Sequence, residues 1–173
     1  MRLSAHGITT DLPAGWEGRI TRRRRPTMVA ASPTPDEAAT RAAPAGPVGA
    51  PGEVPGPVVH LANFALPEDR GDFGSGAVDL MRSGQVFVTL FEYGPESVGQ
   101  ALFTHQGIPT LRPRMFSPTS LQRTISGQAG CQRFFTEANR AFCLYVVLGR
   151  HAEAASLVKK ANTVLAATTI QPT

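Results

Sequence analysis

The segment "AGCQRFFTEANRAFCLYVVLG", residues 129–149, predicts a long β-hairpin. Two strand-like runs flank Ala138 and Asn139, which together give the best turn signal in the segment. Pairing the two runs across this turn places Phe135 opposite Phe142. The register matters because a slip of one residue would move every side chain of a strand to the other face of the sheet.

The same register separates the two cysteines of the chain. Cys131 faces Val146, whereas Cys143 points to the other face because strand side chains alternate. A disulfide requires Cα atoms within about 7 Å of each other, and only a turn centred on Glu137 would pair the two cysteines directly. The sequence therefore predicts two buried, reduced thiols.

Shorter elements surround this hairpin. Alternating side chains or apolar runs bounded by turn residues predict strands at 8–12, 16–20, 58–64 and 85–93. Helices are expected at 77–81, at 95–103, and in the stripe formed by Ala154, Leu157, Val158, Ala161, Val164 and Leu165. Adjacent strands outnumber helices, which favours an α+β fold with a largely antiparallel central sheet flanked by helices.

One segment, residues 26–57, differs from the rest in composition. It holds eight of the fifteen prolines and no aromatic residue. A Pro/Ala/Gly-rich composition of this kind predicts disorder, because it cannot bury enough apolar surface to offset the entropy lost on ordering. Two short strands before it cannot form a domain alone. We therefore interpret it as an insertion between strands of one sheet, within a single α+β domain of residues 1–173.

Both ends of the chain resemble a known family. "GITTDLPAGWE", residues 7–17, is similar to the opening strand, proline turn and tryptophan of PsbP-like (Mog-type) domains. The long hairpin followed by an amphipathic helix running into "VLAATTI" resembles the end of those domains. The chain also resembles small actinobacterial proteins that share the "GWEGRI…RR" opening. The resemblance implies a central antiparallel sheet with helices on both faces and a binding or assembly role; it carries no catalytic residue.

The positive charge of the chain is concentrated in one place. The formal net charge is +4, and the run Arg22, Arg23, Arg24 and Arg25 accounts for all of it. Together with Arg19, this run is the candidate contact for an anion, a nucleic acid or an acidic partner. Weak binding of polyanions is one expectation. The other is that the arginines only solubilise the end of an edge strand.

Templates for catalysis and metal binding are not matched. His6, His60, His105 and His151 are scattered, without the short spacing that zinc ligands require. The loop "EDRGDFGSG" lacks EF-hand, kinase and dinucleotide-binding patterns. A cysteine nucleophile with His60 on a neighbouring strand as its partner stays open, and with it an enzyme of unrecognised type that uses Cys131 or His60. We nevertheless expect no enzymatic activity, no cofactor and no metal.

These observations favour a non-catalytic protein-binding or assembly module, with another protein as its partner. The N-terminus has no apolar region of the kind that a secretory signal contains. No apolar run is long enough to span a membrane. A cytoplasmic location is the resulting expectation, and it agrees with reduced thiols. A deep cleft lined by cysteine, histidine and carboxylates would instead favour an enzyme, and a flat apolar patch would favour a partner surface.

Overall fold

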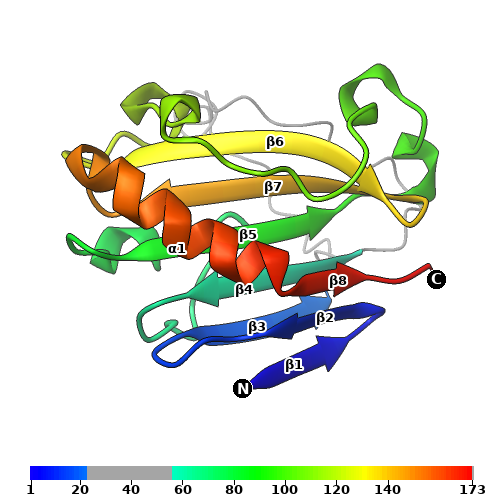
Figure 1. The fold of residues 1–173 in the computed structure, drawn as a ribbon, viewed down its shortest axis with the longest axis horizontal. Helices are drawn as coiled ribbons and strands as arrows, with labels where there is room; N and C mark the ends of the chain where they lie inside the picture. The colour runs from blue at the N-terminus through cyan, green and yellow to red at the C-terminus, as the bar shows by residue number, and fades with distance from the viewer. Residues whose placement is uncertain (23–55, 173) are drawn as a thin grey trace, which may run out of the picture.

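The computed structural model describes residues 1–22 and 56–172, which form two antiparallel sheets and one α-helix (Figure 1). The three-stranded sheet has the order β1 (Arg2–Ala5), β2 (Ile8–Asp11), β8 (Thr168–Ile170). The five-stranded sheet has the order β3 (Glu17–Arg22), β4 (Pro57–Ala62), β5 (Val86–Glu92), β7 (Arg140–Leu148), β6 (Ala129–Glu137). The helix α1 is Ala154–Ala166. A mixed α+β fold with antiparallel sheets is thus confirmed.

The hairpin of β6 and β7 has the predicted register. Phe135 lies opposite Phe142, and Cys131 lies opposite Val146. Ala138 and Asn139 make the turn with φ angles of 51° and 60°. Two successive left-handed residues give the turn a twist that matches the flanking strands, so a two-residue connection suffices.

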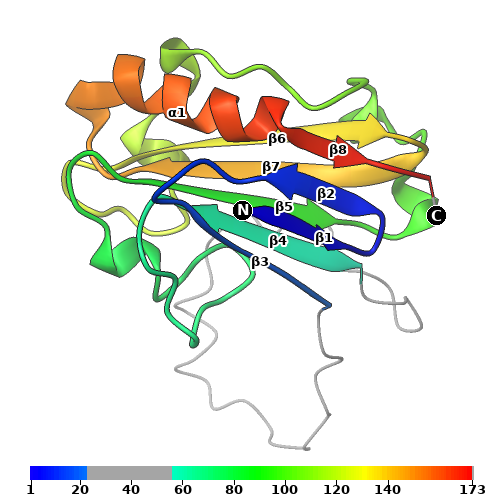
Figure 2. The same cartoon turned by 60° about the horizontal axis from the view of Figure 1, so that its bottom comes forward.

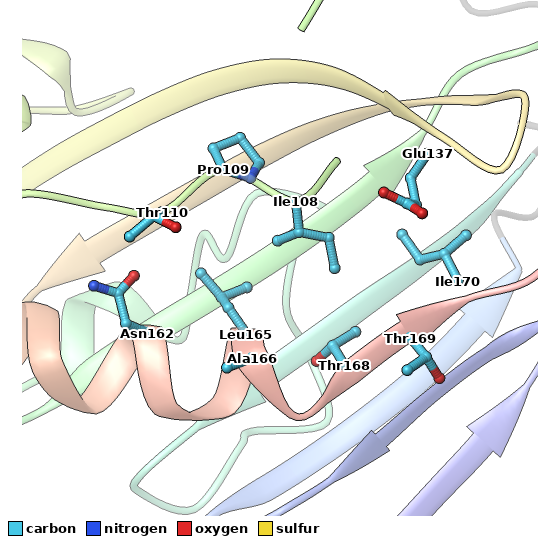
Figure 3. A pocket seen from close by; sticks show the side chains of 10 residues that line it. All are labelled: Ile108, Pro109, Thr110, Glu137, Asn162, Leu165, Ala166, Thr168, Thr169 and Ile170. Carbon is cyan, nitrogen blue, oxygen red and sulfur yellow. The ribbon is translucent and has the colours of Figure 1, made fainter. Parts of the chain in front are cut away.

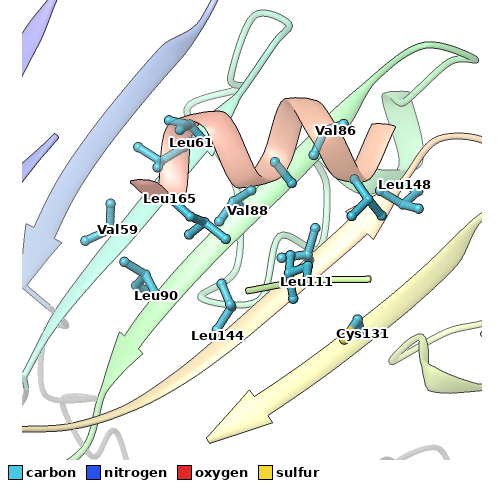
Figure 4. Packing of buried hydrophobic residues seen from close by; sticks show 14 of the residues in the cluster. Val59, Leu61, Val86, Val88, Leu90, Leu111, Cys131, Leu144, Leu148 and Leu165 are labelled. Atoms are coloured by element: carbon cyan, nitrogen blue, oxygen red, sulfur yellow. The ribbon is translucent and has the colours of Figure 1, made fainter. Parts of the chain in front are cut away.

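One face of the five-stranded sheet, here called the helix face, is covered by α1 and by the three-stranded sheet (Figure 2). The predicted stripe of α1 is buried there. The packed residues include Val59, Leu61, Val88, Leu90, Leu144 and Leu148 from the sheet and Leu165 from the helix (Figure 4). Leu157 and Val158 of the helix belong to the same cluster. Burial of both partners explains why this helix forms, since an isolated helix of its length is marginal in water.

The opposite face, here called the loop face, corrects the expectation of helices on both sides. It is covered by connecting segments with short 3-10 turns. The helix predicted at 77–81 is a single turn, Val78–Leu80. The helix predicted at 95–103 is two turns separated by Gly99, whose φ of 85° is incompatible with a right-handed helix.

The N-terminal strands correct a second expectation. Strands 8–12 and 16–20 were expected in one sheet, but β2 and β3 belong to different sheets. The sequence analysis also missed β1, which pairs with β2 across the turn His6–Gly7. β8 completes this sheet on the other side of β2. The extra layer therefore lies on the helix face, beside α1.

The low-complexity segment predicted at 26–57 lies almost entirely outside the described residues. Its flanking strands β3 and β4 are antiparallel neighbours, with Arg22 paired to Pro57. The segment thus connects adjacent strands of the five-stranded sheet. In the part of the chain that the structure describes, no helix has the length and apolar character needed to cross a membrane.

Candidate functional site

The structure describes two of the five predicted arginines, and it places their side chains on opposite faces of one strand. Arg19 and Arg22 are exposed on β3, an edge strand of the five-stranded sheet. They are three positions apart, so alternation directs their side chains to opposite faces of the strand. Arg23, Arg24 and Arg25 lie outside the described residues. Anion binding through this run stays a prediction.

A buried histidine on β4 holds an arginine that the sequence analysis did not select. His60 is 3% exposed, and its Nδ1 accepts a hydrogen bond of 2.9 Å from Arg70 Nε. The other ring nitrogen, Nε2, therefore carries the proton and donates to the carbonyl of Asp72 at 2.8 Å. Burial, followed by the charge of Arg70, lowers the pKa of His60 to about 4, against the opposing effect of that hydrogen bond. The imidazole is neutral at physiological pH and fixes the loop after β4.

The proposed pair of Cys131 and His60 does not form. Cys131 belongs to the helix face, whereas His60 lies with Phe87 on the loop face, and β5 and β7 separate their strands. Both cysteines are free and buried. Burial raises the pKa of both thiols, that of Cys143 to about 12. Neither side chain meets the requirement for an activated nucleophile, a lowered pKa in an accessible site.

We also searched the described residues for clusters of side chains that could bind a metal ion. Within residues 1–22 and 56–172, no three histidine, cysteine, aspartate or glutamate side chains gather in a way that could hold a metal ion. The functional candidates are therefore surfaces and pockets, not titratable clusters.

A groove of about 480 Å³ lies between the end of α1, β8 and the loop before residue 111; we call it the β8 groove (Figure 3). Its lining residues are Ile108, Pro109, Thr110, Glu137, Asn162, Leu165, Ala166, Thr168, Thr169 and Ile170. Apolar side chains from the loop, the helix and β8 project into it, and Glu137 lies at the hairpin end (Figure 3). Glu137 is the one ionisable side chain among these lining residues.

One border of the β8 groove is an open strand edge. Backbone hydrogen bonds join Asp11 to Ala167 at 3.2 Å and Gln171 to Gly7 at 2.8 Å. In an antiparallel ladder the bonded pairs alternate with non-bonded pairs. The N–H and C=O groups of Thr168 and Ile170 therefore point away from β2. β8 is the last strand of its sheet among the described residues, so these groups face the groove.

The opposite border is held in place by a polar side chain of α1 that the sequence analysis did not select. The amide of Asn162 on α1 both donates to and accepts from the backbone of Leu111, at 2.9 Å each. Further along, Gly107 N–H donates to Thr136 O at 2.9 Å, which attaches the loop to β6. The walls of the β8 groove are thus fixed at both ends.

Comparisons with known proteins identify no relative: no family model, no curated protein and no solved structure matches this chain. The resemblance to PsbP-like domains stays a prediction, and the functional argument depends on the structure itself.

Proposed function

We propose that the protein is a non-catalytic binding module that holds an extended segment of a partner protein in the β8 groove. The observation that carries this proposal is the unpaired backbone edge of Thr168 and Ile170. Extended peptides add to open sheet edges through main-chain hydrogen bonds, and pockets for alternate side chains give specificity. The open edge is three residues long and lies between fixed walls.

The lining of the groove indicates which segment fits. Ile108, Leu165 and Ile170 provide apolar surface for one side chain of the bound strand. Glu137 provides a negative charge in a chain whose formal net charge is +4. A segment that combines an apolar residue with a lysine or arginine complements both features. Charge attraction at such a site contributes more to specificity than to affinity.

Amide hydrogen exchange tests this mode of binding. Random peptides displayed on phage are selected on the purified protein, and the best binder is synthesised. Its binding should slow exchange at the amides of Thr168 and Ile170, because they would gain a hydrogen-bond partner. The amide of Thr169 should change little, since the ladder already pairs it with Thr9. Protection confined to other elements would contradict the proposal.

A pair of charge variants tests the chemistry of the segment. Glu137→Gln should weaken binding of a lysine- or arginine-containing peptide several-fold and reduce its salt dependence. Glu68→Gln is the matched control, because Glu68 is an exposed carboxylate in the loop after β4. Equal effects of the two variants would show that Glu137 does not recognise the peptide.

A further inference from the structure

The outer edge of β6 is paired at both of its ends but not in its middle. Among the described residues β6 is the last strand of the five-stranded sheet, next to β7 (Figure 1). At one end Thr136 donates to and accepts from the backbone of residues 105–107, at 2.8 and 2.9 Å. At the other end Gly130 and Ser117 exchange two hydrogen bonds of 3.0 Å. Residues 132–134 lie between these attachments, and we call them the β6 gap.

The backbone of Gln132 and Phe134 points out of the sheet at this gap. The outward bonds of Gly130 and Thr136 show that the even-numbered residues of β6 face away from β7, as the alternation of an antiparallel ladder requires. No backbone group among the described residues bonds to the N–H or C=O of Gln132 or Phe134. The β6 gap therefore offers two donors and two acceptors to an added strand.

The β6 gap is also the accessible part of the strand. Residues 129–131 and 135–136 are buried, whereas Gln132 and Phe134 are half-buried and Arg133 is exposed. Two hollows, of about 440 and 430 Å³, border it. Gln132 and Arg133 line both hollows, and Phe134 lines the larger one. A partner can thus approach this stretch of the edge from solvent.

Side chains on the loop face hold the β6 gap in its strand conformation. Gln132 Nε2 donates to Cys143 Sγ at 3.3 Å. The ring of Phe134 packs edge-on against Phe103, with centroids 5.5 Å apart and planes at 86°. The backbone groups are therefore fixed before a partner arrives, which lowers the entropy lost on binding.

The segment that surrounds the β6 gap is positively charged. Residues 97–136 contain four arginines and neither aspartate nor glutamate. One of these arginines is paired with Asp79. Arg112, Arg114 and Arg133 are exposed and form no ion pair within the part of the chain that the structure describes. This charge favours an acidic partner.

Arg133 is the charge at the centre of the β6 gap. Its side chain projects to the helix face beside the thiol of Cys131; burial raises the pKa of that thiol, and the charge of Arg133 opposes the effect. In an added antiparallel strand, the residue opposite Arg133 would belong to a non-bonded pair, in which side chains approach each other most closely. Opposite charges stabilise such a pair, and like charges destabilise it.

We infer that the β6 gap binds an extended, acidic segment of a partner protein, antiparallel to β6 and with a glutamate or aspartate opposite Arg133. The residues opposite Gln132 and Phe134 would each exchange two main-chain hydrogen bonds, as Ser117 does with Gly130. A second copy of the chain fits less well, because pairing about Arg133 would place two arginines opposite each other. The inference does not depend on the proposed function, which concerns another edge and a basic segment.

Protein-observed NMR tests this inference with three peptides whose ends are blocked. The first is Thr-Val-Glu-Val-Thr, the second has glutamine in place of glutamate, and the third carries an N-methyl group on the valine after the glutamate. The first peptide should shift the amide resonances of Gln132 and Phe134 and slow their exchange. The amide of Arg133 should exchange as before, since the ladder already pairs it with Leu144.

The affinities separate charge recognition from main-chain pairing. The glutamate peptide should bind about two- to fivefold tighter than the glutamine peptide, as expected for a cross-strand charge pair, and added salt should reduce the difference. The N-methylated peptide should not bind, because it lacks one main-chain donor. Equal affinities of the first two peptides, or shifts confined to Thr168 and Ile170 of the β8 groove, would overturn the inference. Protection of Gln132 and Phe134 that rises with protein concentration without peptide would overturn it in favour of a second copy.

A pair of variants assigns the preference to one residue. Arg133→Gln should remove the preference for glutamate over glutamine, and it should fold because Arg133 is exposed. Arg82→Gln makes the same chemical change at an exposed arginine in the turn before β5 and should keep the preference. Loss of the preference in both variants would show that the net charge of the chain causes it, and would overturn the role of Arg133.

Discussion

Arg140 and Glu92 form a two-point ion pair, with Nε to Oε1 at 2.8 Å and Nη2 to Oε2 at 2.6 Å. The same guanidinium donates to the carbonyls of Gln171 at 2.9 Å and His6 at 3.1 Å. Glu92 belongs to the five-stranded sheet, whereas His6 and Gln171 flank strands of the three-stranded sheet. One buried side chain therefore joins the two sheets and fixes the end of β8.

We predict that Arg140→Met destabilises the protein by about 3–5 kcal/mol, because removing one member of a buried ion pair leaves the other charge without compensation. The free energy of unfolding is measured by urea titration. Arg133→Met is the control, since Arg133 is an exposed arginine on the neighbouring strand β6. Arg140→Met should also speed hydrogen exchange at the amide of Gln171, which donates to the carbonyl of Gly7, because Arg140 no longer holds this end of β8 in place. A similar, small loss in both variants would contradict a role in joining the sheets.

His60 should make stability fall with acid. Its pKa is about 4 in the folded protein against an ordinary value of 6.5, so below pH 6.5 the unfolded chain binds the proton first. The stability from the neutral histidine is full above pH 6.5 and is lost progressively down to about pH 4. The total loss is on the order of 3 kcal/mol, from 1.36 kcal/mol for each unit of pKa difference.

Urea titrations from pH 7.5 to pH 4 measure this loss, compared with the variant His60→Gln. The glutamine side chain has an acceptor for Arg70 and a donor for the carbonyl of Asp72, but it cannot titrate. The stability of this variant should therefore fall less over this pH range. His105→Gln is the control, because His105 is exposed on the loop after Phe103. Parallel curves for the natural protein and His60→Gln would show that another group causes the acid sensitivity.

The sequence predicts the hairpin register correctly because the required information is local. The turn at Ala138–Asn139 and the alternation of side chains together determine which residues pair and which face each cysteine occupies. The stripe of α1 is predictable for the same reason, since its periodicity is visible within thirteen residues.

The candidate sites are not local, and the sequence does not predict them. β2, from the other end of the chain, pairs with one edge of β8, and the other edge is open because β8 is the last strand of that sheet among the described residues. Asn162 holds the wall of the β8 groove because its amide meets the backbone of Leu111, fifty-one residues earlier. Polar residues are usually exposed, so composition alone gives no reason to select Asn162. The division into two sheets also depends on contacts between distant parts of the chain, since β2 pairs with β8 and β3 with β4.

The stacked pair of Phe135 and Phe142 predicts where the core is most sensitive. Phe142 is fully buried on the helix face, and its ring lies 5.5 Å from that of Phe135 at an interplanar angle of 18°. Phe142→Ala should cost about 3–5 kcal/mol, the range for a buried phenylalanine. Phe134→Ala provides the comparison, because Phe134 is half-buried on the loop face and should cost less. A denaturant titration in which Phe134→Ala costs more would mean that the loop face carries the main core.

The two cysteines provide a chemical test of the register. Cys131 lies opposite Val146 and Cys143 opposite Phe134, so their side chains occupy opposite faces of the hairpin. Both are buried, and the pKa of Cys143 is raised to about 12 because burial disfavours the thiolate. The thiolate is the reactive form. In the folded protein neither thiol should react with a thiol-specific reagent at pH 8, and reaction should follow global unfolding.

In denaturant without reductant, mass spectrometry should show both cysteines alkylated. Ser126→Cys is the positive control, because Ser126 is exposed in the segment before β6 and its replacement should react at once. Mild oxidation should not join Cys131 to Cys143, since a disulfide requires side chains that approach on one face. A peptide linking residues 131 and 143 by a disulfide in the folded protein would contradict the observed register, and with it the placement of every residue on the helix and loop faces.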